Sequence, residues 1–222
     1  MSHGEMAAVC DVVCVSVPIS ATVAVIEQVG PHMPEESLLM DLTSLKGEPV
    51  AAMLRASRCE VIGCHPLFGP RETSASGQNV VFCPARSRRW LPRLKALFEG
   101  AGAKVVEMPP EEHDAMMAAI QGLNHLHTIE FGEQLAAAGL DAGATAPFST
   151  PLFRTKMEIL QRVLGGNPGL YAEIICANPA VLPLIESHRK SLDDLHELVR
   201  RRDTERLAQR MEAIASKLWP QR

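Results

Sequence analysis

Short apolar runs alternate with stretches of helical periodicity through the first half of the chain, and no strand-like run follows Pro109. The runs are rich in Val and Ile and are bounded by Pro, Gly or Ser, which is typical of β-strands. We expect strands at residues 11–17, 37–42, 60–64, 79–83 and 103–107 and helices at 20–30, 47–57 and 88–100. This alternation predicts an α/β sheet. The first run is almost continuously apolar, which predicts burial on both faces, as in a parallel sheet.

The second half reads as helix throughout. We expect a long helix at about 111–138 and then four more, the last one capped by Asp203. Three of the starts pair a capping side chain with a following proline, at Thr150-Pro151, Asn167-Pro168 and Asn178-Pro179. We therefore predict a truncated Rossmann-like α/β domain at residues 1–109 and an all-helical domain at 110–222.

Composition excludes several classes of protein. A formal net charge of -4 and an aromatic content of 4% give no reason to expect nucleic-acid binding. No apolar run approaches the ~18 residues that suggest a membrane span. The six cysteines form no C-x-x-C pair and no cluster with the spacing of a zinc site. We expect a cytoplasmic protein that binds neither a metal nor a membrane.

Four motifs in the chain carry chemistry. They are Asp41-Leu42-Thr43-Ser44-Leu45-Lys46, Gly63-Cys64-His65-Pro66-Leu67-Phe68-Gly69-Pro70, Glu112-His113-Asp114 and Ser149-Thr150-Pro151-Leu152-Phe153-Arg154. In this order they resemble the prephenate dehydrogenase family, and the resemblance runs from about Asp11 to about Asn178. It implies a Rossmann-like domain followed by a helical domain that forms an intertwined homodimer, with a small-molecule substrate.

His65 is the residue that we expect to be catalytic. The resemblance implies oxidation of prephenate at the ring carbon that bears the 4-hydroxyl, with hydride passing to NAD(P) and loss of the ring carboxylate. The family's histidine at this position hydrogen-bonds that hydroxyl. His65 follows an apolar strand, and the carboxyl ends of such strands are where sites of open α/β sheets lie. The alternative is a turn histidine that bonds local carbonyl groups.

Arg154 and Arg162 are eight residues apart on one expected helix, so they fall on roughly the same side of it. A guanidinium group matches a carboxylate with two parallel hydrogen bonds. The resemblance implies that Arg162 grips a substrate carboxylate and that Arg154 supports the site. The alternative is an ion-pair ladder through Glu158 at i, i+4 spacing.

Five further residues are candidate substrate-binding groups. His113, Gln121 and His125 are spaced so that one face of the long helix could present all three. The family uses polar groups there to line the pocket and secure the dimer, whereas an isolated helix histidine is more often structural. Ser44 and Lys46 follow the second strand, where the family contacts nicotinamide or substrate, although Thr43 or Ser44 could simply cap a helix.

Ser16, Pro18 and Thr22 lie where the family meets the nicotinamide-side ribose of the cofactor. The family's glycine-rich turn does not precede them, because Gly4 is the only glycine before Gly30. Such a turn lets backbone N–H groups approach the pyrophosphate. We therefore expect no tight cofactor binding by this chain alone, with NAD(P) required if the family's activity is kept.

Without the family's earlier strands, the first strand is left with an open edge. An open apolar edge promotes aggregation unless it is covered. We expect residues 12–17 to pair with another chain or to be capped by residues 1–10.

Three functions fit these residues. The first is a cofactor-independent decarboxylation, dehydration or rearrangement of prephenate or a related cyclohexadienyl or aryl-pyruvate acid, in which a protonated His65 donates to the departing hydroxyl. The second is an NAD(P)-dependent prephenate or arogenate dehydrogenase of tyrosine biosynthesis. The third is a dimeric module that senses such a ligand without catalysis. We favour the first, and residues 165–167, Gly-Gly-Asn, leave the substrate itself open because a bulkier polar stretch is expected there.

Overall fold

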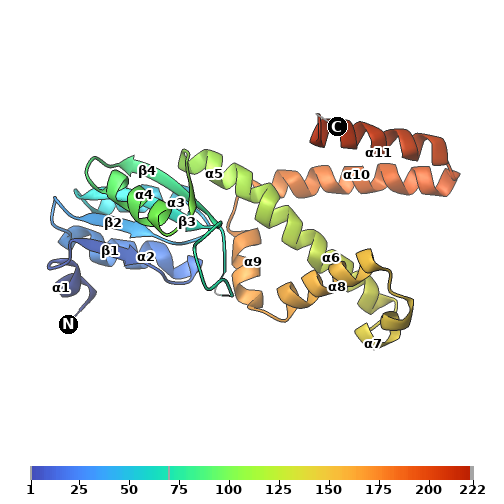
Figure 1. The fold of residues 1–222 in the computed structure, drawn as a ribbon, viewed down its shortest axis with the longest axis horizontal. Helices are drawn as coiled ribbons and strands as arrows, with labels where there is room; N and C mark the ends of the chain where they lie inside the picture. Colours follow the sequence, from blue (N-terminus) through green and yellow to red (C-terminus); the bar gives the residue numbers. More distant parts are fainter. Residues whose placement is uncertain (1, 70, 221–222) are drawn as a thin grey trace. The chain divides into compact units, whose positions relative to one another are not determined.

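The computed structural model describes residues 2–69 and 71–220, and its first half is built on a five-stranded sheet (Figure 1). The strands are β1 (Val12–Val15), β2 (Leu38–Asp41), β3 (Glu60–Pro66), β4 (Asn79–Arg86) and β5 (Lys104–Glu107), and they are arranged in the order of the sequence. β1, β2 and β3 are parallel, β4 is antiparallel to β3, and β5 is parallel to β4. The described residues between β3 and β4 form no helix, and an antiparallel pair needs no crossover helix.

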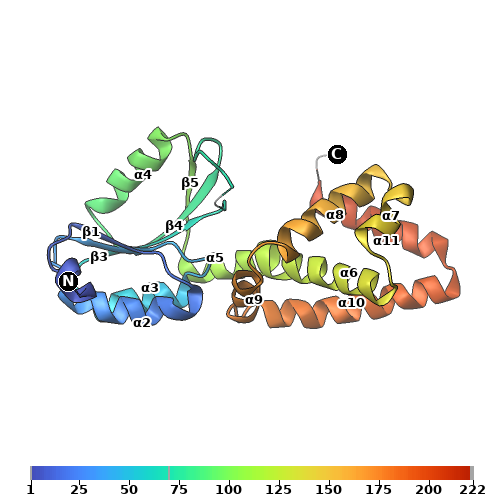
Figure 2. The ribbon, with the colours of Figure 1, turned by 90° about the horizontal axis from the view of Figure 1, so that it is seen from below.

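Helices cover both faces of this sheet, as Figure 2 shows. Helices α2 (Ile19–Val29) and α3 (Gly47–Ala56) lie on one face, where Ile26 and Met53 join the core. Helix α4 (Trp90–Gly100) lies on the other face, where Leu94 packs with Phe82. A sheet between two helical layers is the Rossmann-like arrangement that the sequence predicts, and the predicted fold class is confirmed.

The prediction that the first strand is buried on both faces is wrong. Val13 and Val15 are buried, whereas Val12 and Cys14 are exposed. β1 lies at the edge of the sheet, and its buried residues face the α2 side. β2 has a neighbour on both sides and is buried along its whole length. An apolar run therefore did not distinguish the edge strand from the strand beside it.

The first residues pack on the α2 side of the sheet. Helix α1 (His3–Ala7) begins with a reciprocal capping box between Ser2 and Glu5, and it packs against α2 and the 3-10 turn η1 (Gly30–His32). Within the described part of the chain, residues 2–10 make no backbone hydrogen bond to residues 12–17. The expected capping of this edge by the first ten residues is therefore not formed, and pairing with another chain stays a prediction.

The expected long helix is present but contains a π-helical turn. It comprises α5 (Pro110–Met117), the π turn η2 (Ala118–Leu123) and α6 (Asn124–Ala137). The short α7 (Ala142–Thr145) and the 3-10 turn η3 (Ala146–Phe148) lead to α8 (Pro151–Leu164) and α9 (Pro168–Cys176). Two of the three predicted caps are confirmed, since the Phe153 and Leu170 N–H groups donate to the side chains of Thr150 and Asn167 over 3.2 Å each. The third predicted start is wrong, because the next helix begins at Val181 and Pro179 lies in the turn before it. π turns are rare and are frequent at functional sites.

The chain divides by compactness into two units, Met1–Val181 and Leu182–Arg222. The first holds the sheet and the helices up to α9. The second is a hairpin made from the rest of α10 (Val181–Arg201) and α11 (Thr204–Leu218), in which Arg210 donates to the Ser191 hydroxyl over 2.8 Å. Asp203 caps α11 by accepting from the Arg206 N–H over 3.0 Å, as predicted.

No single helix in the described residues is long and apolar enough to cross a membrane, and only α9 and α10 taken together reach that length and composition.

Candidate active site

His65 lies near the end of β3 and faces a histidine of the helical half. Its Nδ1 is 2.9 Å from Nε2 of His113 on α5, and the two rings meet edge to face with centroids 5.1 Å apart. His113 is fully buried and His65 is 3% exposed. Nε2 of His65 has no hydrogen-bond partner among the described residues, yet it is not one of the fully buried unpartnered atoms. The small accessible part of His65 therefore includes the nitrogen that faces away from His113.

Asp114 extends this contact to the start of α3. Its Oδ1 lies 2.8 Å from His113 Nδ1 and accepts the Lys46 N–H over 2.8 Å, while its Oδ2 accepts the Gly47 N–H over 2.8 Å. Burial raises the pKa of this carboxyl, but the hydrogen bonds from His113, Gly47 and Lys46 outweigh burial and hold the pKa below its ordinary value. Asp114 is therefore ionised at neutral pH, and it joins β3, α5 and α3.

Burial keeps His65 neutral. Desolvation, followed by the electrostatic effects of His113 and Lys46, lowers the pKa of His65 to about 3, and the opposing effect of Asp114 is smaller. The imidazole is therefore uncharged near neutral pH, and its nitrogen without a hydrogen is available to accept a proton. This electrostatic setting disfavours the protonated His65 on which the cofactor-independent reaction depends.

Lys46 performs a structural task in this conformation. Its ammonium group is fully buried, and it pairs with the Asp41 carboxylate and donates to the Cys64 carbonyl oxygen over 2.8 Å. The Thr43 N–H and hydroxyl also donate to Asp41, over 3.0 and 2.6 Å. These contacts fix the ends of β2 and β3 beside His65. Ser44, next in the chain, is half-buried.

Gln121 in the π turn and His125 at the start of α6 each have a polar atom without a hydrogen-bond partner. Oε1 of Gln121 and Nδ1 of His125 are buried and make no hydrogen bond. The His125 ring packs edge to face on Tyr171 of α9, with centroids 4.7 Å apart. Burial lowers the pKa of His125, so its ring is also neutral. Buried polar atoms without a partner cost stability, and such atoms are frequent where a ligand or water binds.

Arg154 and Arg162 are both exposed on α8. Arg154 borders a cavity of about 450 Å³ next to α7, with its Nη1 3.5 Å from the Ser149 carbonyl oxygen. Neither arginine forms an ion pair with Glu158 in the described residues, so the alternative ladder is not formed. Arg162 makes no hydrogen bond or ion pair with the residues described, and its guanidinium group is free to bind an anion.

The candidate cofactor residues divide into two groups. Ser16 and Pro18 line a cleft of about 490 Å³ between the end of β1 and the start of α9. Thr22 is buried within α2, where its hydroxyl donates to the Pro18 carbonyl oxygen over 3.0 Å. Glu173 of α9 also lines the cleft, and it accepts from the Ile19 N–H and the Ser20 hydroxyl at the start of α2.

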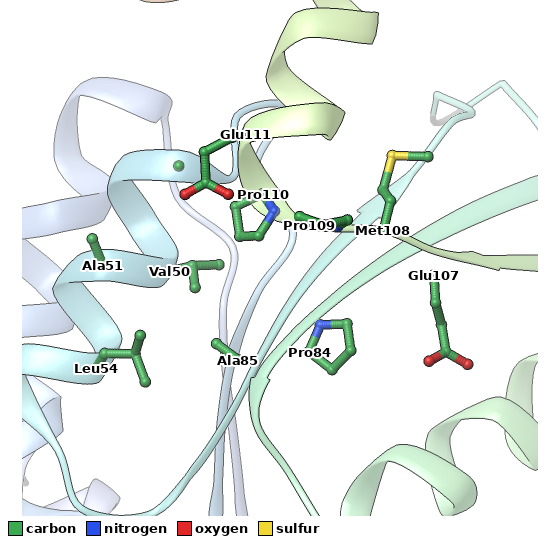
Figure 3. Close-up of a pocket in the computed structure, with 11 residues that line it drawn as sticks. Val50, Ala51, Leu54, Pro84, Ala85, Glu107, Met108, Pro109, Pro110 and Glu111 are labelled. Carbon is green, nitrogen blue, oxygen red and sulfur yellow. The ribbon is translucent and has the colours of Figure 1, made fainter.

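Another groove lies on the α3 side of the sheet, in front of the connection from β5 to α5 (Figure 3). It has a volume of about 490 Å³, and apolar groups such as Leu54, Pro84 and Met108 line it together with the carboxylates Glu107 and Glu111. None of the residues expected at the site borders it, and we do not assign the reaction to it.

The structure thus joins His65, His113 and Lys46 in one buried network. Other candidate residues border separate cavities. Ser16 and Pro18 border one cavity and Arg154 another. The convergence of His65 with Arg162 stays a prediction. Sequence reasoning missed Asp114, whose signal was its place directly after His113, and Asn178, whose amide donates to the Asp114 carbonyl oxygen over 2.8 Å. In the described residues, no three His, Cys, Asp or Glu side chains are placed to hold a metal ion.

This topology and this network at the ends of the strands place the chain in the class of Rossmann-like α/β proteins with a helical second part. Two family models match it in succession. The prephenate dehydrogenase nucleotide-binding domain matches residues 2–107, and the prephenate dehydrogenase dimerization domain matches residues 109–213. The chain belongs to the prephenate dehydrogenase family.

Relatives in sequence agree with this assignment. A probable arogenate/prephenate dehydrogenase of Methanocaldococcus jannaschii is 35% identical over 210 residues, which make up 92% of this chain and 47% of that protein. A 4-amino-4-deoxyprephenate dehydrogenase of Streptomyces pristinaespiralis is 30% identical over 203 residues, covering 90% of this chain and 68% of that protein. The chain spans about half the length of the first curated relatives that it matches, at 47%, 47% and 49%.

Solved structures agree in fold. Prephenate dehydrogenase from Aquifex aeolicus superposes with a TM-score of 0.78 at 22% identity, covering 99% of this chain and 81% of that one. A second structure of that enzyme, in complex with hydroxyphenyl propionate and NAD+, gives a TM-score of 0.77 at 22% identity and covers 99% of this chain and 80% of that one. The named sequence relatives favour the dehydrogenase alternative over the cofactor-independent reaction that we expected first.

Proposed function

We propose that this protein is an NAD(P)-dependent dehydrogenase that acts on prephenate or arogenate. The observation that carries the proposal is His65 at the mouth of the sheet, which is neutral, fixed on one side by His113 and unengaged at Nε2. A ring in this state is a proton acceptor, and oxidation of an alcohol requires one.

The chemistry assigns His65 two successive tasks. Oxidation of the ring alcohol removes hydride from the carbon and a proton from the hydroxyl, and we assign the proton to His65 Nε2. Loss of the ring carboxylate as CO2 then sends an electron pair through the ring toward the oxygen. As the ring becomes aromatic, that oxygen takes the proton back from His65. A bound nicotinamide nucleotide supplies the hydride acceptor.

The cofactor-independent alternative needs the opposite state of this ring. Departure of the hydroxyl as water requires an acid, and a protonated His65 would have to supply the proton. Burial lowers the pKa of His65 to about 3, so this acid is scarce near neutral pH. The same geometry therefore supports the oxidative reaction better.

We assign the substrate to the helical side of His65. Gln121 and His125 are candidates for its polar groups because their buried unpartnered atoms lie on the helix that also carries His113. Arg162 is the candidate for a substrate carboxylate because its guanidinium group is exposed and has no ion-pair partner in the described residues. Arg154 remains its candidate support, while Ser44 is a candidate only through its place beside Lys46.

The residues at the end of β1 fit the nicotinamide end of a dinucleotide. The cleft that Ser16 and Pro18 line has about 490 Å³ and lies at the carboxyl end of the strand, where open α/β sheets bind ligands. Ser16 and Pro18 would hold the nicotinamide ribose there. The match of residues 2–107 to a nucleotide-binding domain supports the same assignment.

We also propose that the protein works as a homodimer in the cytoplasm. The match of residues 109–213 to a dimerization domain supports the first point. The six cysteines are all free, as expected in a reducing compartment, and this supports the second.

The test is an assay of the purified protein with prephenate and with arogenate, each with NAD+, with NADP+ and without nucleotide. We expect reduced nucleotide and CO2 to form in equal amounts, and only when substrate and nucleotide are both present. His65→Asn should lower kcat by about 10²–10⁴-fold, as expected for loss of a positioned base. Arg162→Lys should raise KM, because a lysine cannot form the two parallel hydrogen bonds.

Matched controls are His127→Asn on α6 and Lys156→Arg on α8. Each exchanges the same types of residue as the test variants but at a position outside the assigned site. Both should therefore leave kcat and KM within about 2-fold of the wild-type values, as is usual for surface substitutions. Consumption of prephenate without nucleotide would overturn the proposal in favour of the non-oxidative reaction. Binding of prephenate without any turnover would instead support a sensing module.

A further inference from the structure

Three ionisable groups stand in series beside the proposed reaction centre. Asp114 Oδ1 is 2.8 Å from His113 Nδ1, and His113 Nε2 is 2.9 Å from His65 Nδ1. Each contact uses a different nitrogen of the His113 ring. The ionisation state of the carboxylate therefore influences which nitrogen carries the hydrogen in both rings. We propose that Asp114 and His113 are positioning residues that hold His65 as the Nδ1–H tautomer and so leave its Nε2 as the proton acceptor.

Which atom donates in each hydrogen bond of the series follows from the groups that carry a hydrogen. An ionised carboxylate only accepts hydrogen bonds, so the proton between Asp114 and His113 is on His113 Nδ1. With His113 in its neutral form, its imidazole carries one N–H, so His113 Nε2 is then an acceptor. The proton between the two rings must therefore be on His65 Nδ1. Only the free nitrogen of His65, Nε2, remains to accept a proton from a ligand.

The surrounding structure prevents the series from reversing. While His113 is neutral, reversal would require Asp114 to be protonated, and its carboxylate is held ionised by the N–H groups of Lys46 and Gly47. His113 is fully buried, so its ring has no room to turn to solvent. The Asn178 amide holds the backbone of Asp114 over 2.8 Å. The three groups are thus anchored to α3, α5 and the segment before α10.

This inference deepens the proposed function, because it rests on His65 as the base of that reaction. When His65 accepts a proton at Nε2, the positive charge is shared with a ring that contacts an ionised carboxylate, which stabilises it. The tautomer itself does not depend on the substrate or on the nucleotide. It can therefore be measured separately from the reaction.

The first test reads the tautomers directly. Nitrogen-15 NMR of the full chain, labelled at histidine and free of substrate and nucleotide, distinguishes an N–H nitrogen from a bare one in each ring. His65→Asn and His113→Gln assign the two sets of signals. We expect both rings to be neutral Nδ1–H tautomers at neutral pH. A wild-type His65 that carries its proton on Nε2 would overturn the inference.

The second test separates positioning from mere packing. His113→Gln supplies a carbonyl oxygen that can still accept from His65 Nδ1, whereas His113→Phe fills the space without an acceptor. We expect kcat to fall by about 10²–10³-fold in the Phe variant and by less than about 10-fold in the Gln variant, with KM little changed in both. Equal loss in two folded variants would contradict a positioning role.

Asp114→Asn tests the far end of the series. Asparagine keeps one acceptor oxygen, which can still accept from the Gly47 N–H, so α3 should keep part of its anchoring. An amide can also donate to His113 Nδ1, which would reverse both rings, and a wrong tautomer of this kind costs about 10⁴-fold in kcat in a serine protease triad. We expect a loss of at least about 10²-fold together with a mixed His65 tautomer. Retained kcat with an unchanged tautomer would overturn the role of Asp114.

The outcomes distinguish the inference from the function on which it rests. Nδ1–H tautomers in a protein that oxidises no cyclohexadienyl acid would leave the inference standing and remove the proposed function. Oxidation of prephenate by a protein whose His65 carries its proton on Nε2 would support the proposed function and overturn the inference.

Discussion

At the scale of single residues, Lys46 shows how a charged side chain of a site motif can serve the fold. Its ammonium group is fully buried between the Asp41 carboxylate and the Cys64 carbonyl oxygen. Burying two charges is costly, and their attraction offsets that cost only while both are present. The pair therefore joins the ends of β2 and β3 at the level of His65.

We predict that Lys46→Met lowers the free energy of unfolding by about 3–5 kcal/mol, because it leaves the Asp41 carboxylate buried and unpaired. Urea denaturation measures the change. Lys104→Met on β5, whose side chain is exposed, is the matched control and should alter stability by less than about 0.5 kcal/mol. The double variant Asp41→Leu, Lys46→Met should lose less than the single one. Equal stability of Lys46→Met and the wild type would refute the structural role.

The sequence could identify His65 and His113 as site residues, because each lies in a recognisable motif. It could not identify their contact, since 48 residues separate them and the contact depends on where α5 meets the sheet. For the same reason the sequence ranked Lys46 as a ligand-binding group. Its place after the second strand is local information, whereas the burial of its ammonium group depends on packing.

At the scale of elements, α4 begins with a cap from a distant part of the chain. The Glu60 carboxylate, at the start of β3, accepts from the N–H groups of Arg88, Arg89 and Trp90 over 2.7–3.1 Å, and from the Ser87 hydroxyl over 2.9 Å. Burial raises the pKa of Glu60, but these hydrogen bonds together hold it below its ordinary value. A negative charge at this end of a helix is favourable, so Glu60 fixes α4 against the sheet.

We predict that Glu60→Gln lowers the free energy of unfolding by about 0.5–1 kcal/mol at neutral pH. A carboxyl whose pKa is lowered by folding stabilises the protein above its unfolded-state pKa, and this contribution is lost as the pH falls through the lower folded-state value. The difference between wild type and variant should therefore disappear in acid. Denaturant unfolding at several pH values measures it. Glu99→Gln, at the other end of α4, is the control and should show no such loss.

The extent of each element was largely predictable, whereas the environment of its faces was not. The predicted strands and helices of the first half match the structure to within a few residues, because turn residues bound them. The π turn at Ala118–Leu123 has no local signal, since its residues suit an ordinary helix equally well. The exposure of Cys14 likewise depends on the neighbours of β1.

At the scale of the whole molecule, α11 presents an apolar stripe to solvent. Met211, Ile214 and Leu218 recur on one side of the helix and are 64%, 49% and 63% exposed. Contiguous exposed apolar surface on a protein of this size marks an interaction surface. The match to a dimerization domain ends at residue 213, within α11, and a second copy of the chain is the partner that we propose for this stripe.

We predict that Ile214→Glu weakens dimerisation by at least about 10-fold, or 1.4 kcal/mol, because a carboxylate would be buried without a partner. Sedimentation velocity over a range of concentrations measures the dissociation constant. Gln209→Glu adds the same charge on the opposite side of α11 and should leave the constant unchanged. A stable dimer of the Ile214→Glu protein would place the interface elsewhere.

The double duty of Asp114 restricts what can replace it over evolutionary time. To anchor the start of α3, Asp114 offers one oxygen to each of two N–H groups, and a neutral polar side chain could still accept from one of them. To orient His113 and, through it, His65, the side chain must be an ionised group that only accepts hydrogen bonds. A related protein that had lost the activity but kept the fold could therefore carry a neutral polar residue at this position. The residue found there would indicate whether the histidine is still catalytic.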